Sequence, residues 1–180
     1  GFPLALIAEE KGGSGIDPVE AFGLVRLAGR HALPLPLAET MLANRILTDA
    51  GLPAADGVAT VALGRAGSGF ALTRRGSGWH LAGEGRRVPW ARRAATIAVV
   101  VAGEEGALVA AVRADAASVA PGLNLADEPR DRVRFDIELE AESVHRAPPG
   151  RDLDRLHALG AALRANAMAG ALGRLVEITV

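Results

Sequence analysis

The sequence has 180 residues, of which 49% are hydrophobic and only 3% aromatic, so a core must be packed mainly with Ala, Val and Leu. Twenty basic and twenty-one acidic residues leave a net charge of −1, which argues against nucleic acid or an anionic membrane as a partner. The absence of cysteine excludes disulfides, thiolate metal sites and thiol catalysis, and it is compatible with a cytoplasmic location.

A first helix is predicted after a glycine-rich stretch at residues 12–15, which leaves the chain little steric restriction. Asp17 suits the N-cap, Pro18 suits the first helical position, and Glu20 would close a capping box. The apolar pattern stops at Gly29, where we expect the helix to end. The apolar positions of this helix are Val19, Phe22, Leu24, Val25, Leu27 and Ala28.

A second helix is predicted after the break at Pro34 and Pro36. Gly51 would end it. Its apolar positions, which repeat with the helical period, are Leu37, Met41, Leu42, Ile46 and Leu47. We therefore assign residues 1–53 to an incomplete N-terminal helical domain.

Residues 54–149 have the period of β-strands instead. Short apolar runs separated by turn residues lie at 58–63, 70–73, 79–81, 96–101, 107–112 and 133–140. In the last run, apolar residues from Val133 to Leu139 alternate with charged ones, which is typical of a half-buried antiparallel strand. This spacing predicts a middle domain that is an antiparallel β-barrel or sandwich.

Residues 150–180 return to the helical period, with Asp152 as a possible cap. Many positions between Gly160 and Gly173 are Ala or Gly, and this favours tight helix packing over the close approach of a ligand. Glu177 to Val180 contain no stop signal, so we expect a fragment that ends inside the helix. The predicted class is α+β: an N-terminal helical segment, the middle β domain and the start of a C-terminal helical bundle. The apolar positions of this last helix are Leu156, Leu159, Leu163, Met168, Leu172, Leu175 and Val176.

This order of parts resembles the acyl-CoA dehydrogenase family. The shared features are an acidic-Gly-Gly-Ser-Gly stretch at 9–15, a helix ending in Gly29-Arg30, a Pro-x-Pro link at 34–36 and Glu-Thr-Met-Leu-Ala at 39–43. In that family a helical domain, a middle β-barrel and a C-terminal four-helix bundle follow one another, and FAD lies between barrel and bundle. The resemblance implies α,β-dehydrogenation of an acyl-CoA substrate with hydride transfer to flavin, in a homo- or hetero-oligomer.

The resemblance also indicates which residues face the flavin. Residues 76–91 are similar to the family's strand ending in Gly followed by a strand that lies against the flavin ring. A carboxylate base for the α-proton is expected beyond Val180, so no catalytic residue is assigned in this chain. The cofactor-binding residues that the resemblance implies are Leu63, Arg87, Val88, Pro89 and Trp90.

Two flavin-facing segments depart from the family's pattern. Residues 61–69 lack the usual Thr-Glu-Pro-Gly-x-Gly-Ser-Asp loop. Arg87-Val88-Pro89 replaces Trp-Ile-Thr or Trp-Ile-Ser, and two expected hydrogen bonds to the flavin lose their donors, because proline has no backbone N–H and neither Val nor Pro has a hydroxyl. Arg87 or the backbone of Val88 could replace them. Two alternatives stay open: a degenerate, non-catalytic homologue that acts as the structural partner of a heteromeric dehydrogenase, and an unrelated β-barrel binding module.

Other constellations point to no further site. The four histidines stand far apart, which argues against a metal site. The glycines of 64–69 have the wrong order for a dinucleotide fingerprint. The apolar run 97–101 is too short to span a bilayer. The arginine pairs at 74–75, 86–87 and 92–93 could bind CoA phosphates or a neighbouring subunit, but solvated strand ends are the favoured interpretation.

Overall fold

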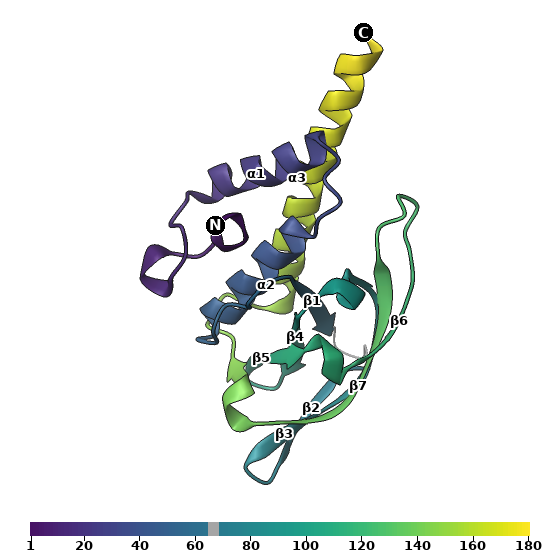
Figure 1. The fold of residues 1–180 in the computed structure, drawn as a ribbon. Coiled ribbons are helices and arrows are strands. Elements are labelled where there is room, and N and C mark those ends of the chain that lie inside the picture. Colours follow the sequence, from purple (N-terminus) through teal and green to yellow (C-terminus); the bar gives the residue numbers. More distant parts are fainter. Residues whose placement is uncertain (65–68) are drawn as a thin grey trace.

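Figure 1 shows the computed structural model, which describes residues 1–64 and 69–180. The helices of this part are α1 (Pro18–Arg30), α2 (Leu37–Asp49) and α3 (Leu153–Thr179). The strands are β1 (Ala59–Gly64), β2 (Ala71–Arg75), β3 (Gly78–Pro89), β4 (Thr96–Gly103), β5 (Gly106–Arg113), β6 (Ser118–Ala120), β7 (Arg130–Leu139) and β8 (Val144–Arg146). Short 3-10 turns lie before α1 and between strands, among them η3 (Ala91–Arg93).

In the described residues, the strands form two four-stranded sheets, in the orders β1-β4-β5-β8 and β2-β3-β7-β6. The α+β class predicted from the sequence is confirmed. Of the two predicted forms, barrel or sandwich, the sheets have the open sandwich. One detail differs from the expected antiparallel pairing: β1 pairs parallel with β4. A parallel partner requires a long crossover, and here β2 and β3 in the other sheet provide it. The division into domains at 1–53, 54–149 and 150–180 stays a prediction.

The first sheet is the middle layer of the molecule, between the helices and the second sheet. On β4, Ala98 and Val100 belong to the core beneath the helices, whereas Ile97, Val99 and Val101 belong to the core between the sheets. Both faces of β4 are therefore buried, which explains why its sequence is a continuous apolar run instead of an alternating one.

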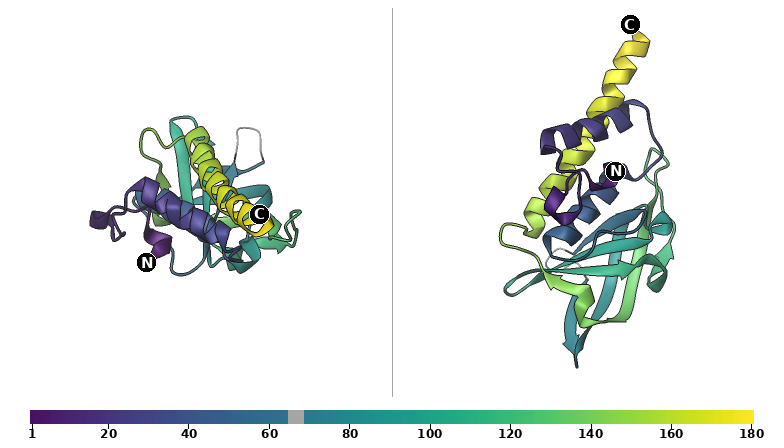
Figure 2. Two further views of the ribbon diagram at one scale, coloured as in Figure 1. Left: turned by 90° about the horizontal axis from the view of Figure 1, so that it is seen from above. Right: turned by 60° about the vertical axis from the view of Figure 1, so that its left-hand side comes forward.

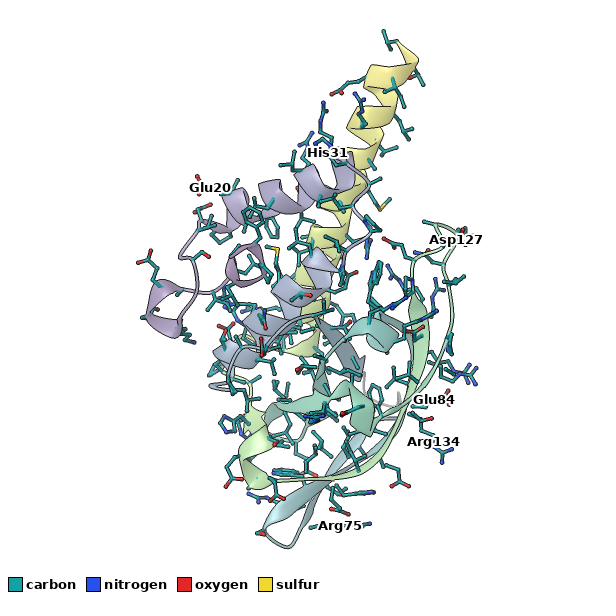
Figure 3. The ribbon with its side chains drawn as sticks, in the orientation of Figure 1. Glu20, His31, Arg75, Glu84, Asp127 and Arg134 are labelled. Atoms are coloured by element: carbon teal, nitrogen blue, oxygen red, sulfur yellow. The ribbon has the colours of Figure 1, made fainter. Side chains whose placement is uncertain are left out.

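The second sheet is buried on one face only. Val133 and Phe135 of β7 are buried, and the intervening Arg134 is exposed, as the alternation predicts. Figure 3 shows Arg75, Glu84 and Arg134 projecting outward from this sheet. The outer face is therefore a charged, solvated surface.

The helix caps follow the sequence closely. The Asp17 carboxylate accepts a hydrogen bond from the backbone N–H of Val19 at 2.8 Å, and Asp152 accepts one from Arg155 N–H at 2.8 Å. In the described residues the Glu20 carboxylate accepts no hydrogen bond that would complete the predicted capping box. Val19, predicted to be on the apolar face of α1, is 76% exposed.

Helices α1 and α3 cross each other (Figure 2), and at the crossing two glycines lie against the backbone of the opposite helix. A Cβ atom on Gly170 would lie 1.9 Å from the backbone oxygen of Arg26, and one on Gly29 would lie 1.9 Å from that of Ala167. Beyond this crossing α3 continues away from the other elements (Figure 1). The predicted apolar positions Met168, at the crossing, and Leu172, Leu175 and Val176, beyond it, are more than half exposed. None of the described helices is long and apolar enough to cross a membrane.

Candidate cofactor cleft

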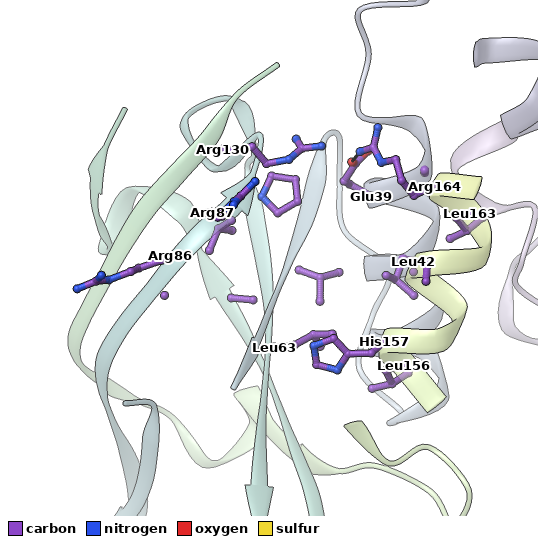
Figure 4. Close-up of a pocket in the computed structure, with 18 of the residues that line it drawn as sticks. Glu39, Leu42, Leu63, Arg86, Arg87, Arg130, Leu156, His157, Leu163 and Arg164 are labelled. Atoms are coloured by element: carbon purple, nitrogen blue, oxygen red, sulfur yellow. Dashed lines mark hydrogen bonds and ion pairs between the residues drawn. The ribbon is translucent and has the colours of Figure 1, made fainter. Parts of the chain in front are cut away.

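A cleft of about 760 Å³ lies between helices α2 and α3 on one side and strands β1 and β3 on the other (Figure 4). This volume is typical of small-molecule sites. The helical wall presents Leu42, Leu156 and Leu163, whose buried side chains also belong to the core beneath the helices. The strand wall contains the end of β3.

Four of the five residues that the sequence assigned to the cofactor line this cleft, namely Leu63, Arg87, Val88 and Pro89. Trp90 does not; it lines a second cleft of about 540 Å³. Trp90 has a left-handed φ of 53°, and its N–H donates to Pro129 O at 3.2 Å as the chain turns into η3. The cofactor roles themselves stay predictions.

The strand wall contains a β-bulge. In the register with β7, Gly85 lies opposite Val133 and Val88 lies opposite Asp131, so two residues of β3 face one of β7. Sequence comparison predicted two successive strands here, and the structure has one strand, Gly78–Pro89, with this bulge inside it. A bulge re-aims side chains while the sheet continues on both sides, and bulges are common beside binding sites.

Arg87, in the bulge, has a left-handed φ of 61°. This conformation costs a non-glycine residue roughly 1–2 kcal/mol. The side chain of its neighbour Arg86 is paired with Glu84 at 3.1 Å, whereas the Arg87 side chain has no ion pair or hydrogen bond within the described residues. The strained residue therefore brings an available positive charge to the cleft.

A group of four charged residues separates the two clefts. Arg164 of α3 pairs with Glu39 of α2 and, at 3.4 Å, with Glu128, which in turn pairs with Arg130 at 2.9 Å. Glu39, Arg130 and Arg164 line both clefts. Figure 4 shows Glu39 and Arg164 side by side at one end of the first cleft. The ion pairs connect the helical wall to the strand wall.

The first cleft is lined by two carboxylates in the described residues, Glu39 and Glu84, and both are ion-paired. His157 also lines it, and its Nδ1 lies 2.8 Å from the backbone oxygen of Leu153. Because a carbonyl only accepts, Nδ1 carries a proton, and in the neutral ring Nε2 is left as an acceptor. Sequence reasoning did not assign His157, Glu39 or Arg164 to the site, since no local motif marks them.

Behind the strand wall lies Asp131, whose side chain is fully buried. Its carboxylate accepts hydrogen bonds from the backbone N–H of Arg92 at 2.9 Å, from Arg92 Nε at 2.9 Å and from the N–H of Gly122 at 3.1 Å. Burial alone would raise the pKa of Asp131, but these hydrogen bonds and the Arg92 charge outweigh it and lower the pKa below its usual value.

The remaining sequence-based assignments have simple outcomes. Residues 65–68 of the divergent loop lie outside the described residues. Of the arginine pairs, Arg74 stacks on Trp79 at 4.7 Å, Arg75 pairs with Glu138, and Arg92 binds Asp131, so these three serve contacts within the chain. Within 1–64 and 69–180, no three His or acidic residues gather as a metal site would require.

No protein-family model and no curated protein matches the chain. Solved structures do. The ChsE4-ChsE5 complex from Mycobacterium tuberculosis matches with a TM-score of 0.84 at 20% identity, over 99% of this chain and 53% of that chain. A variant of the Tcur3481-Tcur3483 steroid ACAD matches with a TM-score of 0.79 at 23% identity, over 99% and 53%. A protein described as an FAD-dependent dehydrogenase matches with a TM-score of 0.67 at 18% identity, over 97% and 57%.

The chain therefore spans about half the length of the solved chains that it matches. At these identities the likeness concerns the fold. The resemblance predicted from the order of helical and β parts is confirmed at that level: this chain has the fold of part of an acyl-CoA dehydrogenase.

Proposed function

We propose that the protein is an FAD-dependent acyl-CoA dehydrogenase, with the flavin held in the cleft between α3 and the end of β3. The observation that carries the proposal is the coincidence of three features in one place. An acyl-CoA dehydrogenase fold positions a cleft of about 760 Å³, the cleft has an apolar helical wall, and its strand wall exposes the positively charged Arg87 from a strained bulge.

The residues of the cleft fit a flavin. Leu42, Leu163 and Val88 supply apolar contacts for a flat ring, and Arg87 supplies a cation for an anionic part of the cofactor. Pro89 offers no N–H, and its carbonyl already accepts from the Thr60 hydroxyl at 2.5 Å, so recognition at this point rests on Arg87 and on shape. When bound, FAD supplies the hydride acceptor.

The other residues of the cleft orient the substrate and exclude water. Because Glu39 and Glu84 are both ion-paired, we assign the α-proton base to neither. The acyl group would lie along the apolar helical wall, where Leu42, Leu156 and Leu163 keep water away from the reacting carbons.

The alternative is a non-catalytic subunit of a heteromeric dehydrogenase. Two observations favour keeping it: Pro89 cannot donate, and the ChsE4-ChsE5 structure is a complex of two named chains. In this case the fold would be retained to support a partner, which we propose is a related subunit.

Cofactor loading distinguishes the two. The purified protein, with any subunit that copurifies, is incubated with FAD, desalted and examined by visible absorbance, and an acyl-CoA is then added without oxygen. We expect retained yellow colour that bleaches with the acyl-CoA. A flavin that is retained but does not bleach supports the non-catalytic alternative. A protein that stays colourless after reconstitution contradicts the proposed flavin site.

A matched pair of variants tests the site within that assay. Arg87→Gln removes the cation of the cleft and should weaken FAD binding, measured by quenching of flavin fluorescence. Arg93→Gln removes an exposed arginine of η3 that does not line the cleft and should leave binding unchanged. Equal effects of the two would show that Arg87 has no special role.

A further inference from the structure

Asp131 differs from all other carboxylates of the described chain, because it alone is buried. A buried carboxylate is costly unless its oxygens are satisfied. Here both oxygens are: one accepts from the backbone of Arg92, and the other accepts from the Arg92 guanidinium and from the backbone of Gly122. The bonds go to two segments far apart in the sequence.

These two segments carry the walls of the clefts. Arg92 belongs to η3, which directly follows the residues of β3 that line the cleft, and Asp131 itself lies opposite Val88 in the sheet. Gly122 begins the segment that returns through Glu128 to β7, and Gly122 O accepts from the N–H of Arg130 at 2.9 Å. The Asp131 side chain thus connects the end of β3 to the segment that separates the two clefts.

The segment that Asp131 supports, from Arg87 at the end of β3 to Arg92 in η3, has a strained backbone. Arg87 and Trp90 are both left-handed, within three residues of each other, and the peptide after Pro89 is held by the bond from Trp90 N–H to Pro129 O. Such conformations persist only where surrounding contacts enforce them. The hydrogen bonds from Arg92 to Asp131 hold the chain directly after these two strained residues.

We propose that Asp131 is a positioning residue: it holds the segment from Arg87 to Arg92 in the conformation that binds the cofactor, without touching the cofactor itself. This rests on the proposed function in so far as the cofactor is FAD. The positioning of Trp90 by Asp131 does not depend on that identity.

The test is Asp131→Asn, which keeps the size of the side chain. The amide loses the charge that binds the Arg92 guanidinium, and it retains only one acceptor oxygen for the four nitrogens that donate to Asp131. We expect FAD to bind about tenfold more weakly, because small displacements of a binding edge are costly. The control is Asp136→Asn, which changes an exposed carboxylate on the same strand; among the described residues the Asp136 side chain pairs with His80 alone, so this variant should bind FAD as the wild type does.

A loss of global stability alone is excluded by a second control. Val99→Ala shortens a buried side chain in the core between the sheets, and since a valine side chain makes no hydrogen bond it removes none of the bonds of Asp131. We expect this change to lower stability while the hydrogen bonds of Asp131 remain, so FAD affinity should hold at temperatures below the melting transition of the variant. If Val99→Ala weakens FAD binding as much as Asp131→Asn does, the positioning role is overturned.

A readout without cofactor separates this proposal from the proposed function. In a Trp79→Phe background Trp90 is the sole tryptophan. Adding Asp131→Asn should red-shift the Trp90 emission and increase its quenching by acrylamide, whereas Asp136→Asn should change neither. If the wild type binds no FAD, the flavin proposal fails and the Trp90 signal decides on positioning. If Asp131→Asn leaves the Trp90 emission unchanged, the role of Asp131 is overturned. It is also overturned if the wild type binds FAD and Asp131→Asn binds it equally well.

Discussion

The two walls of the cleft are built in different ways. The helical wall consists of buried leucines on α2 and α3 in ordinary helical conformation, and α3 is held against α1 by the glycine crossing at Gly29 and Gly170. The strand wall contains a bulge with the left-handed Arg87. The left-handed Trp90 follows directly after this wall, and a buried charge, Asp131, lies behind it.

The difference indicates where the chain serves packing and where it serves a ligand. Local preference, apolar pattern and burial agree along the helical wall, which is what a sequence selected for stability shows. Along the strand wall the residues depart from their preferred conformations, and such departures concentrate at functional sites. Changes to the cleft-lining leucines of the helical wall should therefore affect stability and binding together, whereas changes to the strand wall should separate stability from binding.

The largest effect is expected at the helix crossing. Gly170→Ala should lower the free energy of unfolding by about 3 kcal/mol, because the new Cβ would lie 1.9 Å from a backbone oxygen of Arg26 and the two helices must move apart. The measurement is urea unfolding followed by circular dichroism.

The matched control is Gly173→Ala in the same helix, where a Cβ would meet nothing within 4 Å. Because alanine has a higher helix propensity than glycine, this substitution should raise the free energy of unfolding by up to about 1 kcal/mol. If Gly170→Ala also raises the free energy of unfolding, α1 and α3 do not pack closely through Gly170.

A smaller effect is expected from acid. The pKa of Asp131 is lowered by folding, so its contribution is present above its unfolded pKa of about 3.9 and is lost as the pH falls through the lower folded value. At pH 7, Asp131→Asn should cost about 2 kcal/mol of unfolding free energy, typical of hydrogen bonds to a charged group. The difference from wild type should shrink as the pH falls below about 4.

Asp49, beside the helical wall, is the comparison for this measurement. It is bound by Arg45 Nε at 2.8 Å and Arg151 Nε at 2.5 Å, and although burial opposes the shift, these partners lower its pKa as well. Asp49→Asn should show the same pH dependence in stability and no change in FAD affinity. Loss of FAD affinity in Asp49→Asn would mean that the two walls are not separable.

The smallest effect on stability is expected at Arg87, and its sign is unusual. Arg87→Gly should raise the free energy of unfolding by about 1 kcal/mol, because glycine adopts φ of 61° without strain. The same substitution should weaken FAD binding by removing the cation.

The control is Arg86→Gly, next in the strand but without a positive φ, which should lower stability by about 0.5–1 kcal/mol. Thermal unfolding and flavin titration of both variants give the two quantities. A loss of stability in Arg87→Gly would show that the bulge is not strained at this residue.

Several features could be predicted from the sequence because they depend on neighbours along the chain. Asp17 and Asp152 cap their helices through bonds to residues two and three positions later. The alternation of β7 is a property of the strand itself. The choice of residues 87–89, which line the cleft, came from the family resemblance and not from a local pattern. The short strands β6 and β8 were missed, since three residues carry too little pattern.

Other features required the folded chain. The helical pattern of α3 continues through Met168 and Leu172, yet these side chains are exposed, because periodicity says which face is apolar and not how far a neighbouring element extends. Trp90 directly follows Pro89 in the sequence but lines a different cleft, because the left-handed φ of Trp90 itself turns the chain at this point. Glu39, His157 and Arg164 meet the strand wall only through packing.

The sequence by itself determined the order of helical and β parts, the helix caps and the fold resemblance, because each depends on local conformational preference and on apolar periodicity. Only the tertiary structure decided that β1 joins β4 in parallel, that Gly170 meets α1, and that Asp131 is buried behind the strand wall. These contacts join residues distant along the chain, and their free energy depends on burial and geometry that no local pattern contains.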